Sequence, residues 1–130
     1  MTATVVDSDI VLRAVDVTKT YGVTRALKGV DFDIRSGKVT VLFGENGAGK
    51  STLMKILSGV EQPTSGGLLL NGEPVVLQST VDARQRGISI IHQELNLCPN
   101  LSVRDNIFLG REVSNGRLGI NFKAESESTR

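Results

Sequence analysis

The residues best suited to chemistry lie in one short run that combines glycines, a lysine and hydroxyl groups. It comprises Gly44, Glu45, Asn46, Gly47, Ala48, Gly49, Lys50 and Ser51, and it fits the pattern G-x-x-x-x-G-K-[ST] at every fixed position. Glycines let the backbone N–H groups turn inward and form a nest for an anion. A helix that begins at Lys50 would add the positive end of its dipole at the same place. The run is therefore a predicted phosphate-binding loop.

The side chains at the end of the loop have separate predicted roles toward a nucleoside triphosphate. Lys50 can reach the β- and γ-phosphates as a mobile charge, and the Ser51 hydroxyl is placed to bind Mg²⁺. Thr52 can help to hold the α-phosphate. The alternative is a glycine turn that precedes a helix by chance. It is disfavoured because an apolar run, Val39 to Phe43, comes before the loop and an amphipathic pattern follows it.

The elements before the loop are predicted to be strands. Spaced apolar residues from Ile10 to Val17 indicate a half-buried strand, and Val30 to Ile34 shows alternation that ends at the turn beginning with Arg35. The apolar run Val39 to Phe43 is typical of a central parallel strand covered on both faces.

The elements after the loop alternate between helices and strands. A helix over residues 50–60 has apolar residues at helical spacing, namely Leu53, Ile56, Leu57 and Val60. The other predicted elements are a hairpin of 68–70 with 74–77 around Asn71-Gly72, a helix capped by Ser79 or Thr80 and stopped by Gly87, a strand at Ile88–Ile91, a helix capped by Ser102, and a last helix from about Asn121. We expect residues 1–9 to be disordered and residues 10–130 to form one partial domain.

The composition narrows the possible classes of partner. Lys and Arg number 15 and Asp and Glu number 14, a net charge of +1 that gives no reason to expect a nucleic-acid partner. No apolar stretch approaches the roughly 20 residues that cross a bilayer, so we expect no direct membrane insertion. Cys98 is the only cysteine and no signal-peptide pattern is present, which fits a reducing cytosol.

The wider pattern, from about Ile10 onward, resembles ATP-binding subunits of ABC transporters. Tyr21 stands where the family places an aromatic residue that stacks on adenine, although a lone tyrosine at a strand end is more often a packing residue. Gln93 resembles the glutamine of the Q-loop, which implies contact with Mg²⁺ or the attacking water. His92 is the only histidine, and we interpret it as a surface residue rather than a catalytic base.

The finer resemblance is to carbohydrate importers of the ribose, xylose and galactose type, in the N-terminal part of the first nucleotide-binding domain. It rests on residues 44–55, on residues 92–95 and on residues 105–112. It implies an α/β P-loop NTPase fold of the ABC type, with an antiparallel β subdomain and an incomplete parallel-sheet core that ends inside the helical subdomain. It also implies ATP and Mg²⁺, a second ATP-binding domain, permease subunits, and a place on the cytoplasmic face of the membrane.

Three features of a complete ABC ATPase are not found in the sequence. They are an apolar strand ending in Asp-Glu, a Leu-Ser-Gly-Gly-Gln motif and a histidine after His92. We therefore expect this chain to bind nucleotide without hydrolysing it and to be poorly stable alone. A non-catalytic interaction fragment remains the alternative. A small P-loop kinase or GTPase is disfavoured because the spacing of Tyr21 and Gln93 does not suit it and no Asn-Lys-x-Asp motif is present.

Overall fold

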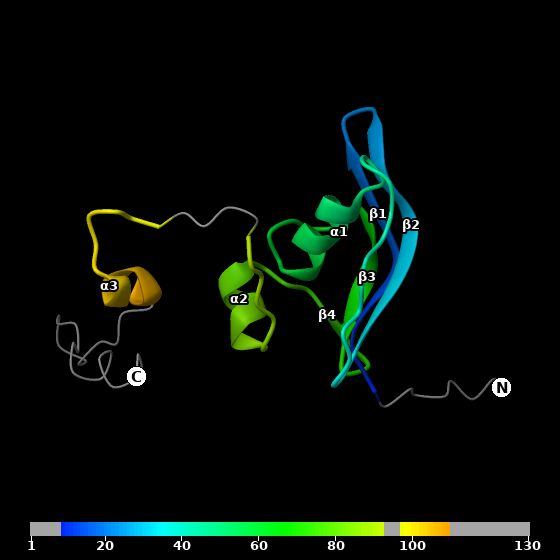
Figure 1. Ribbon diagram of the computed structural model, residues 1–130. Helices are drawn as coiled ribbons and strands as arrows, with labels where there is room; N and C mark the ends of the chain where they lie inside the picture. The colour runs from blue at the N-terminus through cyan, green and yellow to red at the C-terminus, as the bar shows by residue number, and fades with distance from the viewer. Residues whose placement is uncertain (1–8, 93–96, 110–130) are drawn as a thin grey trace. The chain divides into compact units, whose positions relative to one another are not determined.

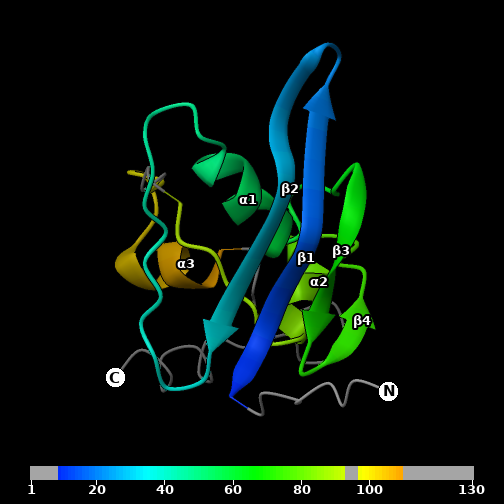
Figure 2. The same ribbon diagram turned by 90° about the vertical axis from the view of Figure 1, so that its right-hand side faces the viewer.

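The computed structural model describes residues 9–92 and 97–109. The chain divides into two units, Met1–Ile90 and Ile91–Arg130. The first unit is built on an antiparallel sheet with the strand order β2-β1-β3-β4, whose strands lie side by side in Figure 2. The bounds are β1 (Ile10–Tyr21), β2 (Thr24–Arg35), β3 (Ser65–Leu70) and β4 (Glu73–Val75), with helices α1 (Lys50–Leu57) and α2 (Thr80–Gln85). Helix α1 covers one face of this sheet (Figure 1).

The two predicted N-terminal strands are confirmed and are longer than their apolar patterns indicated. β1 and β2 form a hairpin whose register runs from Ile10 opposite Arg35 to Tyr21 opposite Thr24. Gly22 has φ +57° in the turn that joins them. The hairpin therefore carries Tyr21 at its tip, on the end of a strand that is paired along both edges.

β1 contains a bulge that changes which of its side chains face the core. Asp16 has φ +45°, and the register shifts against both neighbouring strands at this point. Leu12, Ala14 and Val17 are buried, so the buried apolar positions change from even to odd across the bulge, and Val15 is 39% exposed. A two-residue alternation cannot predict this change, because one extra residue inverts the faces of all that follow.

The core lies between the sheet and α1. The sheet contributes Leu12, Ala14, Val17, Leu27 and Leu68, and the helices and the segments beside them contribute Leu53, Ile56, Leu57, Leu77 and Ala83. Each large side chain buried in this way stabilises the unit by roughly 1.5–3 kcal/mol. α1 ends at Leu57, earlier than predicted, and Val60 is 42% exposed. The Ser58 hydroxyl donates to the Met54 carbonyl at 2.9 Å, and the Ser58 N–H donates to the same carbonyl at 3.1 Å.

The second hairpin confirms the predicted turn. Asn71 and Gly72 have φ of +51° and +85° and join β3 to β4. Two left-handed residues match the type I′ turn, whose twist suits two antiparallel strands.

Helix α2 has the predicted cap. The Ser79 hydroxyl accepts a hydrogen bond from the Asp82 N–H at 3.2 Å, and Gly87 follows the helix with φ +88°. Ser79→Ala is expected to lower the free energy of unfolding of this unit by about 1 kcal/mol. Tyr21 is the only tyrosine and there is no tryptophan, so urea unfolding followed by Tyr21 fluorescence measures this unit alone. Ser36→Ala, in an exposed turn, is the matched control, and an equal loss in both variants would contradict the assignment of the cap.

Two predicted strands are wrong. Residues 39–43 and 88–91 are not assigned to a strand, and within the described part of the chain no backbone hydrogen bond joins either segment to one. Val39, Val41 and Phe43 are 93%, 75% and 95% exposed, whereas Leu42 packs against the core. An apolar run becomes a strand only where another strand can pair with it, and no described segment takes that place.

The second unit contains one helix among its described residues, α3 (Val103–Phe108). The Ser102 hydroxyl accepts from the Asp105 N–H at 3.1 Å, so the predicted cap is confirmed. Asn106 fastens this helix to the preceding turn, because the Cys98 N–H donates to Asn106 Oδ1 at 2.8 Å. The helix predicted from about Asn121 lies outside the described residues.

Candidate functional site

The glycine-rich loop has the backbone that a phosphate nest requires. Gly47 and Gly49 have φ of +84° and +88°, and these left-handed residues flank Ala48. The Ala48 N–H donates to the Glu45 carbonyl at 3.2 Å and closes the loop. The Leu53 N–H is bonded to the Gly49 carbonyl at 2.9 Å, which begins the helical ladder of α1. The amides at this helix start are those that have no intrahelical carbonyl, so they suit an anion.

The backbone of Gly49 lies very close to β2 of the sheet. A Cβ added there would lie 2.6 Å from the Ala26 carbonyl oxygen and 2.6 Å from Leu27 Cδ2. No atom lies within 4 Å of a Cβ added at Gly47, so that glycine faces open space. One glycine therefore permits close packing of the loop on β2, and the other leaves room where a ligand would approach.

Lys50 folds back across the loop that precedes it. Its ammonium donates to the carbonyls of Gly44 and Glu45, each at 2.6 Å. The positive charge is thus held at the loop, and the first turn of α1 contains no acidic residue to oppose an anion there. This arrangement fits the phosphates of a nucleotide, which would offer Lys50 stronger acceptors than neutral carbonyls.

The two hydroxyl residues after Lys50 have different surroundings. Ser51 is exposed in the first turn of α1, where a hydroxyl can serve as one oxygen ligand of Mg²⁺. Mg²⁺ usually keeps several waters and takes its other ligands from phosphates, so one protein oxygen is compatible with such a site. Thr52 is half-buried, and against the larger opposite effect of Glu61 its side chain lowers the pKa of Tyr21 slightly. No cluster of three or more candidate metal ligands occurs within residues 9–92 and 97–109.

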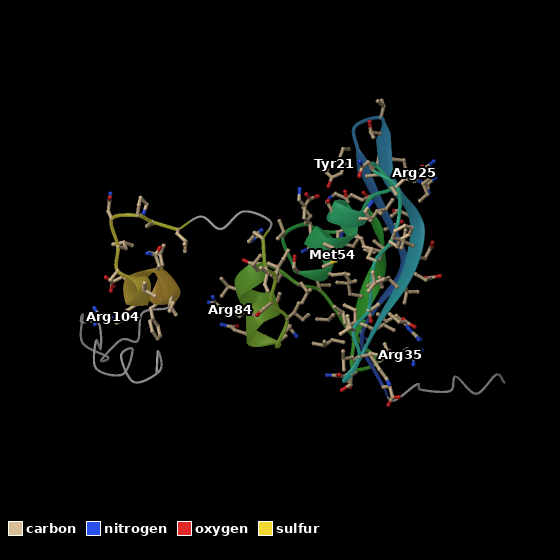
Figure 3. The ribbon with its side chains drawn as sticks, in the orientation of Figure 1. Tyr21, Arg25, Arg35, Met54, Arg84 and Arg104 are labelled. Atoms are coloured by element: carbon tan, nitrogen blue, oxygen red, sulfur yellow. The ribbon has the colours of Figure 1, made fainter. Side chains whose placement is uncertain are left out.

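The fold brings Tyr21 to the helix that follows the loop. Tyr21 is the last residue of β1, is 44% exposed and points to the side of the sheet that carries α1 (Figure 3). Its hydroxyl donates to Glu61 Oε2, and the Lys19 ammonium lies 5.2 Å from the centre of its ring. The hydrogen bond to Glu61 and partial burial raise the pKa of Tyr21 above its usual value. The ring is therefore accessible while its hydroxyl is held.

Glu61 is the site residue that sequence reasoning missed. Besides Tyr21, its carboxylate contacts Lys19 at 3.5 Å and Lys55 at 3.4 Å. The Tyr21 hydroxyl, followed by Lys55 and Lys19, lowers the pKa of this carboxyl below its usual range. No spacing links Glu61 to Tyr21, because β1 and the segment before β3 are brought together only by the sheet.

Two other predicted residues lie in the second unit. Gln93 is outside the described residues, so its predicted contact with Mg²⁺ or water stays a prediction. His92 is described and is exposed. Among the described residues, no helix is both long and apolar enough to span a bilayer.

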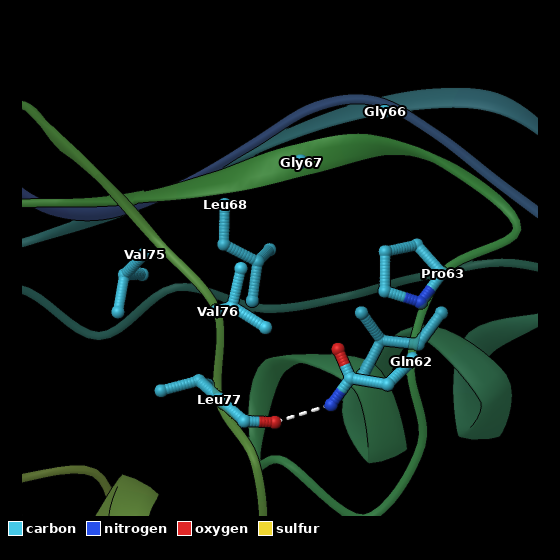
Figure 4. A pocket seen from close by; sticks show the side chains of 9 residues that line it. Gln62, Pro63, Gly66, Gly67, Leu68, Val75, Val76 and Leu77 are labelled. Atoms are coloured by element: carbon cyan, nitrogen blue, oxygen red, sulfur yellow. Dashed lines mark hydrogen bonds between the residues drawn. The ribbon is translucent and has the colours of Figure 1, made fainter.

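A small cavity near β3 is distinct from the phosphate loop. It is about 70 Å³ in volume and is lined by Ile56, Gln62, Pro63, Gly66, Gly67, Leu68, Val75, Val76 and Leu77 (Figure 4). The Gln62 amide donates to the Leu77 carbonyl at its edge. Sites for small molecules usually measure roughly 300–1,000 Å³, so this cavity is too small for a nucleotide.

A glycine loop with left-handed Gly47 and Gly49 that leads into a helix at Lys50 has the features of a P-loop of a nucleotide-binding protein. Comparison with known proteins gives the family. The chain belongs to the ABC transporter family, which it matches over residues 27–130. The ABC-type fold predicted from the sequence is confirmed. Its antiparallel β subdomain is formed as predicted, whereas the two parallel strands expected next to it are not.

The curated relatives confirm the predicted similarity to sugar importers. The chain is 55% identical over 108 residues to the ribose import ATP-binding protein RbsA of Rhodopirellula baltica, covering 83% of this chain and 21% of the relative. It is 52% identical over 118 residues to a putative ribose/galactose/methyl galactoside import ATP-binding protein of Burkholderia cenocepacia, covering 91% of this chain and 22% of the relative. The chain thus spans about a fifth of the length of these relatives.

Solved structures agree with the fold. CbiO1 from Clostridium perfringens, part of the ABC transporter complex CbiONQ, has a TM-score of 0.52 and 34% identity over 61% of this chain and 32% of its own. An ATP-binding cassette of an ABC transporter in its ADP conformation has a TM-score of 0.57 and 28% identity over 60% of this chain and 31% of its own. A nucleotide-free ATP-binding cassette, at 20% identity, covers 92% of this chain and 51% of its own with a TM-score of 0.68, which shows the fold alone.

Proposed function

We propose that this chain binds MgATP through residues 44–52, with the adenine stacked on Tyr21. The observation that carries the proposal is the left-handed backbone at Gly47 and Gly49 directly before Lys50 and the start of α1. Together they place a nest of amides, a helix N-terminus and an ammonium at one loop, which is the combination that binds a polyphosphate. The ring of Tyr21, 44% exposed and turned to the side of the sheet that carries α1, is the surface on which we propose that adenine stacks.

The chain itself is proposed to bind nucleotide without turning it over. Its residues 10–130 correspond in this proposal to the first part of a nucleotide-binding domain, in which Ser51 and Gln93 contact Mg²⁺. ATP hydrolysis needs an acidic residue that orients water and further groups that neutralise the transferred phosphoryl group. The Asp-Glu strand end and the Leu-Ser-Gly-Gly-Gln motif that would supply them do not occur in the sequence.

The longer protein is proposed to be the ATPase subunit of an importer for ribose or a related sugar. This rests on the names of the relatives, which are import ATP-binding proteins. Its partners would be permease subunits in the membrane and a second ATP-binding domain, and it would act at the cytoplasmic face. These assignments concern a protein as long as the relatives, and this chain matches about a fifth of their length.

The test is a set of three measurements on the purified chain. Calorimetry with MgATP is expected to show one binding event per chain, and phosphate release is expected to equal that of buffer alone. Adenine stacking should also quench the fluorescence of Tyr21, the only tyrosine. Absence of binding by a folded chain would refute the proposed function, and phosphate release above the buffer rate would refute the non-catalytic part of it.

A further inference from the structure

The carboxylate of Glu61 is the centre of a group of charges at the tip of β1. It accepts a hydrogen bond from the Tyr21 hydroxyl, and the ammonium groups of Lys19 and Lys55 lie 3.5 Å and 3.4 Å from it. Its side chain is 22% exposed, whereas that of Lys55 is 52% exposed. Three separate residues contact this carboxylate, one through a hydroxyl and two through ammonium groups. Together these contacts restrict its position more than a single contact would.

The Tyr21 ring needs such an anchor. It stands at the end of a strand, next to Gly22 in the turn, and almost half of its surface is exposed. Without a polar partner an exposed ring can adopt several rotamers, and binding a base would have to select one of them. The hydroxyl bond to Glu61 restricts this choice. Lys19, 5.2 Å from the ring centre, also donates to the Gln62 carbonyl at 2.7 Å and limits it further.

The backbone around Glu61 is fastened to the same strand end. The Thr20 N–H donates to Thr64 Oγ1 at 3.0 Å, and the Thr64 N–H donates to the Thr18 carbonyl at 2.8 Å. Thr64 is therefore hydrogen-bonded to the end of β1 through both its side chain and its backbone. Lys55, the third partner of the carboxylate, belongs to α1, the helix that begins at Lys50. Glu61 thus joins the ring of Tyr21 to the helix that follows the phosphate loop.

We propose that Glu61 is a positioning residue for the base of the nucleotide: it holds the Tyr21 ring in its stacking orientation and at a fixed distance from α1. The proposal rests on the proposed function and adds to it a residue that touches neither the base nor the phosphates. It requires that substitution of Glu61 lower the affinity for ligands that contain adenine and leave the affinity for a ligand with phosphates alone almost unchanged.

The experiment compares two ligands by calorimetry on the full 130-residue chain, MgATP and magnesium tripolyphosphate. Glu61→Ala is expected to weaken MgATP binding about tenfold, a loss within the range that base–aromatic stacking supplies. Its affinity for tripolyphosphate is expected to change by less than about twofold, because the loop is intact. The matched control is Asp33→Ala, which removes the carboxylate of the Arg13 ion pair from the same sheet and should change neither affinity.

Three further variants show whether Glu61 acts through the tyrosine. Tyr21→Phe keeps the ring and loses the hydroxyl, so it should weaken MgATP binding by a similar factor. The double variant should then be no weaker than either single variant, because both remove one interaction. Glu61→Gln keeps an acceptor for the Tyr21 hydroxyl and removes the charge. It is expected to bind MgATP with an affinity between those of the wild type and Glu61→Ala, and it provides the measurement if Glu61→Ala does not fold.

The results separate this proposal from the proposed function. Equal losses for MgATP and tripolyphosphate would mean that Glu61 only supports the fold, and unchanged MgATP binding would mean that it does not position the ring. Either result overturns the role of Glu61 while nucleotide binding by the wild type stands. A wild-type chain that binds neither ligand overturns both.

Discussion

Lys50→Ala is expected to weaken MgATP binding by about 100-fold, the largest effect of any single side chain in the loop. Hydrogen bonds to charged groups each contribute roughly 1.5–3 kcal/mol, and the ammonium can donate to two phosphates. The loss should be similar for tripolyphosphate, because Lys50 contacts no part of the base in the proposed complex. Calorimetry with both ligands measures the two affinities.

The control for this prediction is a substitution that removes the charge of another lysine, one that lies outside the loop. Lys38 is exposed at the turn after β2, and Lys38→Ala should leave both affinities within about twofold of the wild type. Lys50→Arg keeps the charge but replaces a compact ammonium by a planar fork, so we expect it to recover little of the binding. Wild-type affinity in a folded Lys50→Ala chain would refute the assignment of the phosphate loop.

Gly66→Ala is expected to lower the free energy of unfolding of the first unit by about 3 kcal/mol or more. Gly66 has φ +78°, a conformation that costs a side chain of the L series roughly 1–2 kcal/mol. A Cβ there would also lie 2.5 Å from the Asp16 carbonyl carbon and 2.6 Å from the Val15 carbonyl oxygen. These are backbone atoms at the bulge of β1, so relieving the overlap means moving a central strand, which costs a further 1–3 kcal/mol or so.

The comparison that isolates this clash is Gly37→Ala. Gly37 also has a positive φ, +64°, but no atom lies within 4 Å of its added Cβ. Gly37→Ala should lower the free energy of unfolding by only about 1 kcal/mol, because it carries the cost of the backbone conformation without a steric overlap. Urea unfolding followed by Tyr21 fluorescence gives both values. Equal losses would show that the contact between β3 and the bulge of β1 contributes little to stability.

Because β3 pairs with β1 beyond the bulge, a substitution at Gly66 should also affect ligand binding at the proposed site. The pair of Thr18 with Ser65 continues the ladder toward Tyr21, and their hydroxyls lie 2.6 Å apart. A displaced β3 would carry residues 61–64 with it and so move Glu61 away from the Tyr21 hydroxyl. Gly66→Ala is therefore expected to weaken MgATP binding more than tripolyphosphate binding in any fraction that remains folded.

Several features could be predicted because they depend on neighbouring residues. The loop from Gly44 to Ser51 rests on eight consecutive residues, and the caps at Ser79 and Ser102 and the Asn71-Gly72 turn each rest on residues within four positions of one another. Their backbone conformations are set by whether a Cβ is present and where a short side chain can accept an N–H. The family followed from the same short motifs taken in order.

The pairing of distant segments was decided only by the tertiary structure. Val39 to Phe43 is as apolar as a central strand, yet it is not one here, because strand formation depends on a partner that no local pattern contains. The bulge at Asp16 inverted the faces of β1, and the sheet brought Glu61 to Tyr21 across 40 residues of sequence. The sequence by itself determined the loop that we propose to bind phosphates, because its glycines, lysine and hydroxyls are consecutive. The tertiary structure decided what holds the ring proposed to receive the base, since that contact exists only once β1 and the segment before β3 lie side by side.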